Sequence, residues 1–246
     1  MTVVFVHGVF ETARLWDDVR SHLFTDSIAW ELPGFGVPRP DGFGASMDDY
    51  VDWLVRELRG LGKPVDLVGH GWGALLVVRA VTLHPAAARS WTADQIGALH
   101  PEYAWPDAAR WWQAGDAGRD RSDSSLERDK GYLALQFAAA GAPSGHVDTL
   151  CKGLTATSVR CAHDLYRSAT PNVHAYWGAA LSMPTRMPGL VLQPSLDAFD
   201  DRAMADYMAA RLAARTQSLD GLGHWWMLER PKTARVLERF WNSVVA

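Results

Sequence analysis

The chain has 246 residues, enough to bury a full hydrophobic core, and this length suits one α/β domain that carries an insertion. Its net charge of −4, with interspersed signs, offers no basic patch for nucleic acid, and no apolar run is long enough to span a membrane. The chain starts with a strand pattern rather than a signal peptide, so we expect a cytoplasmic protein in which Cys151 and Cys161 are free thiols.

Short β-prone runs alternate with helical patterns at both ends of the chain. The expected strands lie at 2–6, 27–32, 65–68, 89–93, 190–193 and 216–219. The expected helices lie at 13–23, 47–60, 74–83, 201–214 and 231–245. This alternation predicts a doubly wound, mostly parallel sheet, in which functional residues lie at the carboxyl ends of the strands.

One of these helices carries its own start signal. Ser46, followed three residues later by Asp49, has the form of a capping box in which Asp replaces the usual Glu. Apolar residues then recur at spacings of three and four, at Met47, Tyr50, Val51, Leu54, Val55 and Leu58. The pattern predicts a helix that turns one apolar face to the sheet.

The alternation of strands and helices breaks between about residues 96 and 184, where the pattern is mostly helical. We therefore expect a core formed by residues 1–95 and 185–246 and a helical cap formed by residues 96–184. The polar segment 115–130 predicts an exposed loop within this cap. Tryptophans are dense in this part of the chain and suit either an apolar ligand chamber or an aromatic core: Trp91, Trp105, Trp111, Trp112 and Trp177.

The stretch from Val65 to Leu76 reads as a strand, a tight turn and a helix. Gly69 and Gly73 have the spacing of a nucleophile elbow, G-x-Nu-x-G, in which the central residue is raised above the sheet edge. That central residue is Gly71. A dinucleotide loop would need glycine in place of Ala74, and a phosphate loop would need a Gly-Lys-Ser/Thr ending. The stretch therefore predicts the scaffold of a nucleophile without the nucleophile.

Candidate acid–base residues follow the last two strands. His224 lies in a loop after the last strand, where a catalytic triad places its imidazole. Asp197 follows the strand before it and is the preferred partner for this histidine. The alternative acids are Asp200, Asp201 and Asp94.

The turn after the first strand, His7-Gly8-Val9-Phe10, is placed to offer backbone N–H groups to an oxyanion. The amides of Phe10 and Trp72 would form this oxyanion hole. His70 is expected to pack structurally, without a role in chemistry. Five further histidines show no metal-ligand spacing, so we predict no metal: His84, His100, His146, His163 and His174.

Together these residues resemble the α/β-hydrolase superfamily, and most closely its epoxide hydrolase branch, which shares an architecture with haloalkane dehalogenases. The elbow of that branch typically reads Val-Gly-His-Asp-Trp-Gly, and residues 68–73 match it except that Gly71 replaces the aspartate. Segment 164–167 is similar to the cap motif whose tyrosine protonates the epoxide oxygen, which implies that role for Tyr166. Tyr176 or Tyr103 would be the second phenol. Residues 221–224, followed by 229–231, look like the histidine loop of the family.

The resemblance implies a hydrolase of small apolar substrates that needs no cofactor and works as a monomer or homodimer, without a nucleic-acid or membrane partner. The side chains expected to contact the substrate are His7, Trp105, Tyr176, Trp177 and Trp225.

Two departures from the family pattern matter. The oxyanion motif His-Gly-x-Pro ends here in Phe10 instead of proline, and Gly71 cannot form the alkyl-enzyme ester on which enzymes of this branch depend. Three explanations of Gly71 remain open. It is an engineered or inactivating change, or Asp197 and His224 act on water or substrate directly, or the chain is a non-catalytic small-molecule binding protein. A serine-type esterase or lactonase scaffold is the alternative ancestry.

Overall fold

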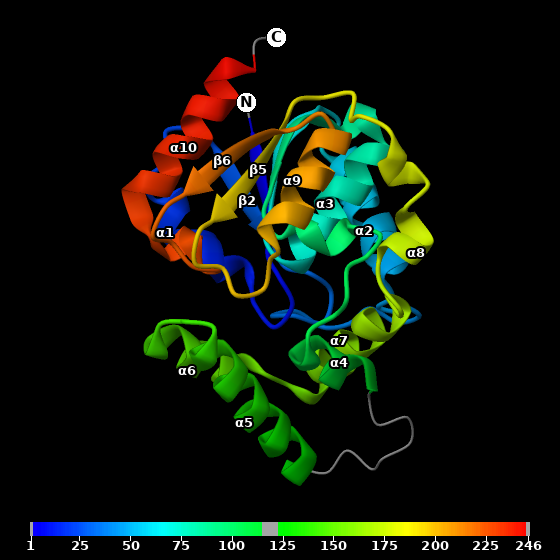
Figure 1. The fold of residues 1–246 in the computed structure, drawn as a ribbon. Helices are drawn as coiled ribbons and strands as arrows, with labels where there is room; N and C mark the ends of the chain where they lie inside the picture. The colour runs from blue at the N-terminus through cyan, green and yellow to red at the C-terminus, as the bar shows by residue number, and fades with distance from the viewer. Residues whose placement is uncertain (1, 115–122, 245–246) are drawn as a thin grey trace.

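A parallel six-stranded sheet, in the order β2-β1-β3-β4-β5-β6, forms the centre of the computed structural model, which describes residues 2–114 and 123–244 (Figure 1). All neighbouring strands are parallel, as predicted. The strands are β1 (Val3–Val6), β2 (Ser27–Trp30), β3 (Val65–Gly69), β4 (Ala88–Ala93), β5 (Gly189–Pro194) and β6 (Arg215–Leu219). The predicted doubly wound α/β fold is confirmed.

The register of the central strands decides which residues meet at the carboxyl edge. Val6 of β1 lies beside Gly69 of β3, which lies beside Ala93 of β4. The residues that follow these three positions therefore leave the sheet side by side, although they come from distant parts of the sequence.

Helices cover both faces of the sheet (Figure 1). On one face lie α2 (Met47–Gly60), α3 (Trp72–Leu83) and α9 (Arg202–Arg211), and on the other lie α1 (Asp17–Arg20) and α10 (Arg230–Ser243). Alternate residues of β1 point to opposite faces, so Val4 and Val6 join one apolar cluster and Val3 and Phe5 join the other. The core therefore consists of two apolar layers separated by the sheet.

The start of α2 forms as its sequence predicts. Asp49 N donates to the Ser46 side chain at 3.2 Å, and Ser46 N donates to the Asp49 carboxylate at 2.9 Å, which completes the capping box. The apolar residues at spacings of three and four are all buried.

The helix expected at 13–23 is shorter and divided. Residues Ala13–Trp16 form a 3-10 turn (η1), and only Asp17–Arg20 are α-helical. The Ser21 hydroxyl and the His22 ring both bond to the carbonyl of Asp18, at 2.8 and 2.9 Å, so side chains take an acceptor that a longer helix would use.

Four helices of the insertion lie at the carboxyl ends of the strands (Figure 1). They are α4 (Asp107–Ala114), α5 (Asp123–Ala139), α6 (Ser144–Gly153) and α7 (Ala156–Ser168). At the ends of the insertion, η3 (Ile96–Leu99) packs on α9, and α8 (His174–Trp177) and η4 (Ala180–Ser182) return to the core helices, with η4 on α3.

The loop expected at 115–130 is wrong for residues 123–130, which form the first half of α5. Leu126, Leu133 and Phe137 recur at helical spacing and pack on the core, and this sparse apolar stripe outweighs the polar composition around it. Residues 115–122 lie outside the described part of the chain.

Cys151 and Cys161 are both free thiols, as predicted. Over residues 2–114 and 123–244, the structure contains no helix whose length and apolar character would let it cross a membrane.

Candidate active site

Strand β3 leads through a tight turn directly into α3, and Gly71 forms that turn. Its backbone angles, φ 56° and ψ −124°, lie in a region that side chains rarely adopt. Side chains at the flanking glycines would collide with backbone, because a Cβ on Gly69 would meet Gly73 and a Cβ on Gly73 would meet Val6 and His7. The two flanking glycines therefore allow backbone segments to approach each other more closely than side chains would permit.

A Cβ at residue 71 would collide with no other atom. A Cβ built there would have its nearest neighbours at ordinary contact distances, Gln95 Oε1 at 3.5 Å and Gly8 Cα at 3.6 Å. We call the volume beside this position the Gly71 space. It belongs to a cavity that Gly71 lines together with Gln95 and His224.

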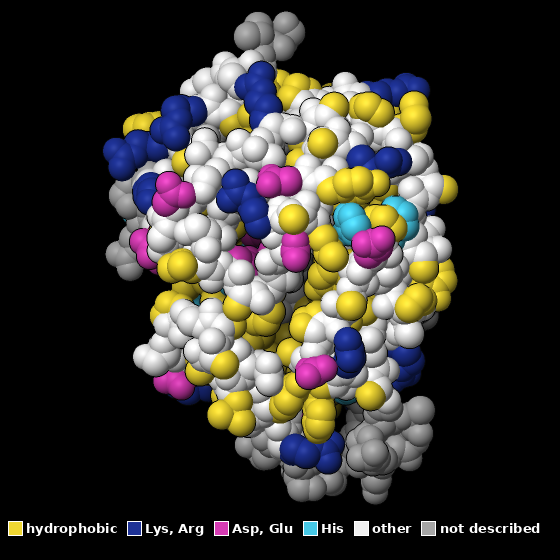
Figure 2. Space-filling model, in the orientation of Figure 1, with side chains coloured by type: hydrophobic (Ala, Val, Ile, Leu, Met, Phe, Trp, Pro, Cys, Tyr) yellow, Lys and Arg dark blue, Asp and Glu magenta, His cyan; other side chains and the backbone are white. Residues whose placement is uncertain are grey.

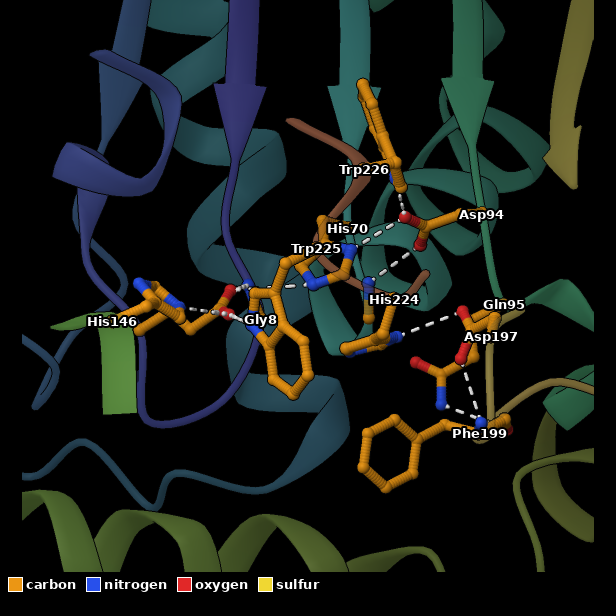
Figure 3. Close-up of polar contacts among 12 residues, drawn as sticks. Gly8, His70, Asp94, Gln95, His146, Asp197, Phe199, His224, Trp225 and Trp226 are labelled. Carbon is orange, nitrogen blue, oxygen red and sulfur yellow. Dashed lines mark hydrogen bonds and ion pairs between the residues drawn. The ribbon is translucent and has the colours of Figure 1, made fainter. Parts of the chain in front are cut away.

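His224 and Asp197 are hydrogen-bonded to each other at the carboxyl edge of the sheet (Figure 3). His224 Nδ1 donates to Asp197 Oδ2 at 3.0 Å, which leaves Nε2 for other partners, and Asp197 Oδ1 accepts from the amide of Phe199 at 2.8 Å. Burial favours a higher pKa for Asp197, but the charge and hydrogen bond of His224 outweigh it and lower this pKa. The pair has the geometry of a general base held by a carboxylate.

The alternative acids have other partners. Asp200 Oδ1 accepts from the amide of Gly97 at 3.0 Å, and Asp201 caps α9 by accepting from the amide of Met204 at 2.9 Å. Asp94 binds the elbow itself, since its Oδ1 accepts from the amide of Gly71 at 2.8 Å. The catalytic role of Asp197 stays a prediction, but it is the acid that contacts His224.

His70, which was expected only to pack structurally, is the centre of a buried charge network (Figure 3). Its Nδ1 donates to Asp94 Oδ2 at 2.6 Å, and its Nε2 lies 3.6 Å from Glu11 Oε2. The indoles of Trp225 and Trp226 donate to Glu11 and Asp94 respectively. All five side chains are buried.

Opposite charges keep this network ionised. Burial alone would lower the pKa of His70, but Asp94 and Glu11 outweigh burial and raise it to about 9. Burial would raise the pKa of Glu11, but His70 and His146 outweigh it and lower this pKa to about 2. At neutral pH, His70 is therefore an imidazolium between two carboxylates. His70 and Asp94 are adjacent because of the register between β3 and β4. A correct prediction of this register would therefore have predicted their contact.

A cavity of about 80 Å³ lies between the sheet edge and the insertion helices. Hydrophobic side chains gather along this boundary in Figure 2, where the face is hollowed. From the core, Glu11, His70, Gly71, Gln95 and His224 line it. From the insertion, Tyr103, Trp105, Trp112, Leu133 and Tyr166 line it.

Tyr166 presents a neutral phenol to this cavity. Its ring lies edge-on to Trp72 at 5.4 Å and to Trp105 at 5.5 Å. Burial raises the pKa of Tyr166 to about 12, and burial also raises the pKa of Tyr103. Of the two candidates for a second phenol, Tyr103 lines the cavity, whereas Tyr176 is 57% exposed and donates to the carbonyl of Thr170.

Four of the five residues predicted to contact the substrate do not line this cavity, and their side chains have other partners. His7 accepts from the amide of Leu32 at 3.0 Å and organises the first loop. Trp177 donates to Asp48 at 2.8 Å and joins α8 to α2. Tyr176 is exposed, and Trp225 is buried and donates to Glu11 at 2.7 Å. Trp105 alone of the five predicted residues lines the cavity.

The tryptophans of this part of the chain divide between the cavity lining and the apolar core. Trp105 and Trp112 line the cavity, whereas Trp91 and Trp177 are fully buried in the core. Trp111 is partly exposed on α4.

The two predicted oxyanion-hole residues border the cavity. Phe10 has a positive φ of 70°, and Trp72 is the first residue of α3, where backbone N–H groups lack helical partners. Within the described residues, neither backbone N–H has an acceptor. Both are therefore available to a bound oxygen atom. The oxyanion-hole role stays a prediction.

The described residues contain no group of three or more His, Cys, Asp or Glu side chains arranged to hold a metal ion. The polar groups at or beside the cavity include His224 with Asp197, the His70 network, the amides of Phe10 and Trp72 and the Tyr166 phenol.

Comparisons with known proteins agree with this architecture. The sequence profile described as the alpha/beta hydrolase family matches residues 3–236, which is nearly the whole chain. No curated protein sequence matches the chain.

Several solved structures share the fold at low sequence identity. Cfl2 from Burkholderia cenocepacia has a TM-score of 0.79 at 19% identity, covering 97% of this chain and 87% of its own. Epoxide hydrolase A from Mycobacterium thermoresistibile has a TM-score of 0.72 at 20% identity, covering 97% and 90%. The ancestral haloalkane dehalogenase AncHLD2 has a TM-score of 0.74 at 20% identity, covering 99% and 91%.

Proposed function

The chain belongs to the alpha/beta hydrolase family, and we propose that it is a hydrolase in which His224 and Asp197 activate water directly against a small apolar epoxide. One observation carries this proposal. A buried imidazole, held by Asp197 at 3.0 Å, lines a cavity in which the nucleophile position is Gly71. A base without a protein nucleophile beside it is suited to deprotonate water.

Among the described residues, two imidazoles line the cavity, and only that of His224 is able to act as a base. His70 holds its proton at neutral pH because Asp94 and Glu11 raise its pKa to about 9. His224 has one carboxylate on Nδ1 and can accept a proton at Nε2. Asp197 then stabilises the imidazolium that forms.

The proposed step adds one water molecule to the epoxide and opens its ring. As His224 Nε2 takes a proton from water, the water oxygen bonds to a ring carbon and the bond from that carbon to the ring oxygen breaks. Tyr166 donates its phenolic proton to the departing oxygen, which gives a diol. The imidazolium proton then returns to the Tyr166 phenolate through solvent, and both residues are restored.

Three observations support an epoxide over other substrates. Tyr166 is a neutral proton donor, since burial raises its pKa to about 12. Aromatic side chains dominate the insertion side of the cavity. Several structures of the same fold are named epoxide hydrolases, including those from Mycobacterium thermoresistibile and Vigna radiata.

The first test is turnover by the unchanged chain and its His224→Ala variant, on aryl epoxides, haloalkanes and p-nitrophenyl esters. We expect epoxide hydrolysis, reduced about 10²- to 10⁴-fold in kcat by His224→Ala, the range that general-base catalysis contributes. Hydrolysis of esters alone would favour an esterase or lactonase. Ligand binding without turnover of any substrate would favour a binding protein, and either result would contradict the proposal.

The second test separates direct water attack from a carboxylate nucleophile. In a single turnover in H₂¹⁸O, direct attack places ¹⁸O in the diol at once. A carboxylate nucleophile would transfer one of its own unlabelled oxygens instead. Gly71→Asp is the matched comparison, because it restores the family nucleophile and should give unlabelled product. An unlabelled first turnover by the unchanged chain would overturn the direct mechanism and point to Glu11, the one carboxylate among the described residues that line this cavity.

A further inference from the structure

A side-chain oxygen that the step above does not use borders the Gly71 space. Gln95 Oε1 would lie 3.5 Å from a Cβ at residue 71, and Gly8 Cα limits the space on another side at 3.6 Å. Gln95, Gly71 and His224 all line the same cavity. A water needs only about 10–15 Å³, so the cavity of about 80 Å³ to which this space belongs accommodates one.

The Gln95 amide is held in one orientation. Its Nε2 donates to the carbonyl of Phe199 at 3.2 Å, which turns Oε1 towards the cavity (Figure 3). The Gln95 backbone is left-handed, with φ 48° and ψ 26°, a conformation that is uncommon for a residue other than glycine. Strained backbone of this kind gathers at functional sites.

One loop orients both Gln95 and the proposed base. Phe199 accepts from Gln95 through its carbonyl and donates to Asp197 through its amide, at 2.8 Å. Asp197 in turn holds His224 at 3.0 Å. The acceptor atoms Gln95 Oε1 and His224 Nε2 are thus set by one connected group of residues, 197–199.

We infer that Gln95 is a positioning residue that, together with His224, holds the hydrolytic water in the Gly71 space. This inference rests on the proposed function and adds the location of its nucleophile. The water donates one hydrogen to Gln95 Oε1 and the other to His224 Nε2, which directs an oxygen lone pair into the cavity. Because an amide oxygen does not take the proton, deprotonation occurs only towards His224.

The absence of a side chain at residue 71 is a requirement of this arrangement. A methyl group at this position would occupy the space at ordinary contact distance from Gln95 Oε1 and would exclude the water. In this arrangement Gly71 has two functions: it adopts the positive φ, and it leaves space for the water.

The first readout is structural and needs no substrate. Crystal structures of the unchanged chain, Gln95→Met and Gly71→Ala would be compared. We expect an ordered water within about 3.2 Å of both Gln95 Oε1 and His224 Nε2 in the unchanged chain and in neither variant. If the Gly71 space of the unchanged chain has no such water, or if the water persists in Gln95→Met, the inference is wrong.

The second readout is kinetic. Gln95→Met keeps the side-chain length and removes the acceptor, so kcat should fall about 10- to 100-fold, as for a misplaced reactant, while KM changes little. Gly71→Ala should lower kcat in the same way. Gln136→Met, which removes the same kind of amide from α5 on the opposite wall, should affect KM rather than kcat.

The outcomes separate the two proposals. If no substrate is turned over but the water is present and lost in both variants, the water site stands and the proposed hydrolysis fails. If epoxides are hydrolysed with an unchanged kcat in Gln95→Met, the hydrolase stands and the role of Gln95 is overturned. Thermal unfolding of each variant shows that any loss of kcat is not a loss of fold.

Discussion

His70 lies between two buried carboxylates, and its charge state follows from them. Asp94 contacts Nδ1 at 2.6 Å, and Glu11 lies 3.6 Å from Nε2. A residue that carries a full positive charge at the base of the cavity cannot also accept a proton from water. The protonation of His70 therefore leaves the proposed general-base role to His224, which is hydrogen-bonded to Asp197.

This charge gives the protein a pH-dependent stability. The folded pKa of His70, about 9, lies above its ordinary value of 6.5. The stabilisation is thus complete below pH 6.5 and is lost as pH rises through 9. At 1.36 kcal/mol for each pKa unit, we expect the free energy of unfolding to fall by about 3 kcal/mol across this range. Urea denaturation at several pH values measures it, and His70→Gln should lose this dependence.

Nuclear magnetic resonance of the imidazole nitrogens gives a direct check. His70 should titrate near pH 9 in the folded protein. The exposed His22 provides the matched control for the denaturation experiment, since His22→Gln should leave the pH dependence of the free energy of unfolding unchanged. A His70 pKa below 7 would contradict the network as described.

At the scale of elements, the β3–α3 turn depends on backbone atoms that approach too closely for side chains. Gly73 belongs to α3, and a Cβ there would meet the backbone carbonyls of Val6 and His7. Gly131 lies inside α5, where a Cβ would meet nothing within 4 Å. Close backbone contact thus requires glycine at residue 73, whereas no steric contact requires it at residue 131.

The same substitution should therefore have opposite effects at the two sites. Gly131→Ala should raise the free energy of unfolding by about 0.5–1 kcal/mol, because alanine is the better helix former. Gly73→Ala should lower it by about 1–3 kcal/mol, because the added methyl forces backbone apart. Urea denaturation of both variants measures the difference. A stabilising effect of Gly73→Ala would show that α3 can shift away from β1.

At the scale of the whole molecule, the insertion helices close two cavities against the core. The first, of about 80 Å³, contains the candidate site. The second, of about 110 Å³, lies beside it and is lined by residues that include Leu15, Phe35 and Leu150. Phe10 and Glu11 line both cavities and so form the wall between them.

The wall at Phe10 predicts a limit on substrate length. Phe10→Ala should join the two cavities and raise kcat/KM for longer alkyl epoxides relative to short ones by about 10-fold, the range for extra methylenes in an apolar pocket. A series of epoxides of increasing chain length measures this ratio. Phe24→Ala, which changes a fully exposed phenylalanine, should leave the ratio unchanged. An unchanged ratio in Phe10→Ala would mean that substrate does not extend towards the second cavity.

Local patterns in the sequence determined the parallel sheet, the capping box at Ser46 and the tight turn around Gly71. Each depends on spacings within a few residues, which are visible without knowing where the chain goes next. The same patterns placed His224 and Asp197 at the edge of the sheet where functional residues gather. The α-helical part of the polar segment was missed because it carries only Leu126 of the apolar stripe, which Leu133 and Phe137 continue further along α5.

Only the tertiary structure decided which of these residues meet. The strand register brings His70 to Asp94 and so leaves Asp197 as the partner of His224. The insertion places Tyr103 rather than Tyr176 in the cavity, and the first loop brings Glu11 beneath His70. The physical reason is the same in each case. These pairings depend on sheet register and helix packing between segments far apart in the chain, and no local spacing encodes those distances.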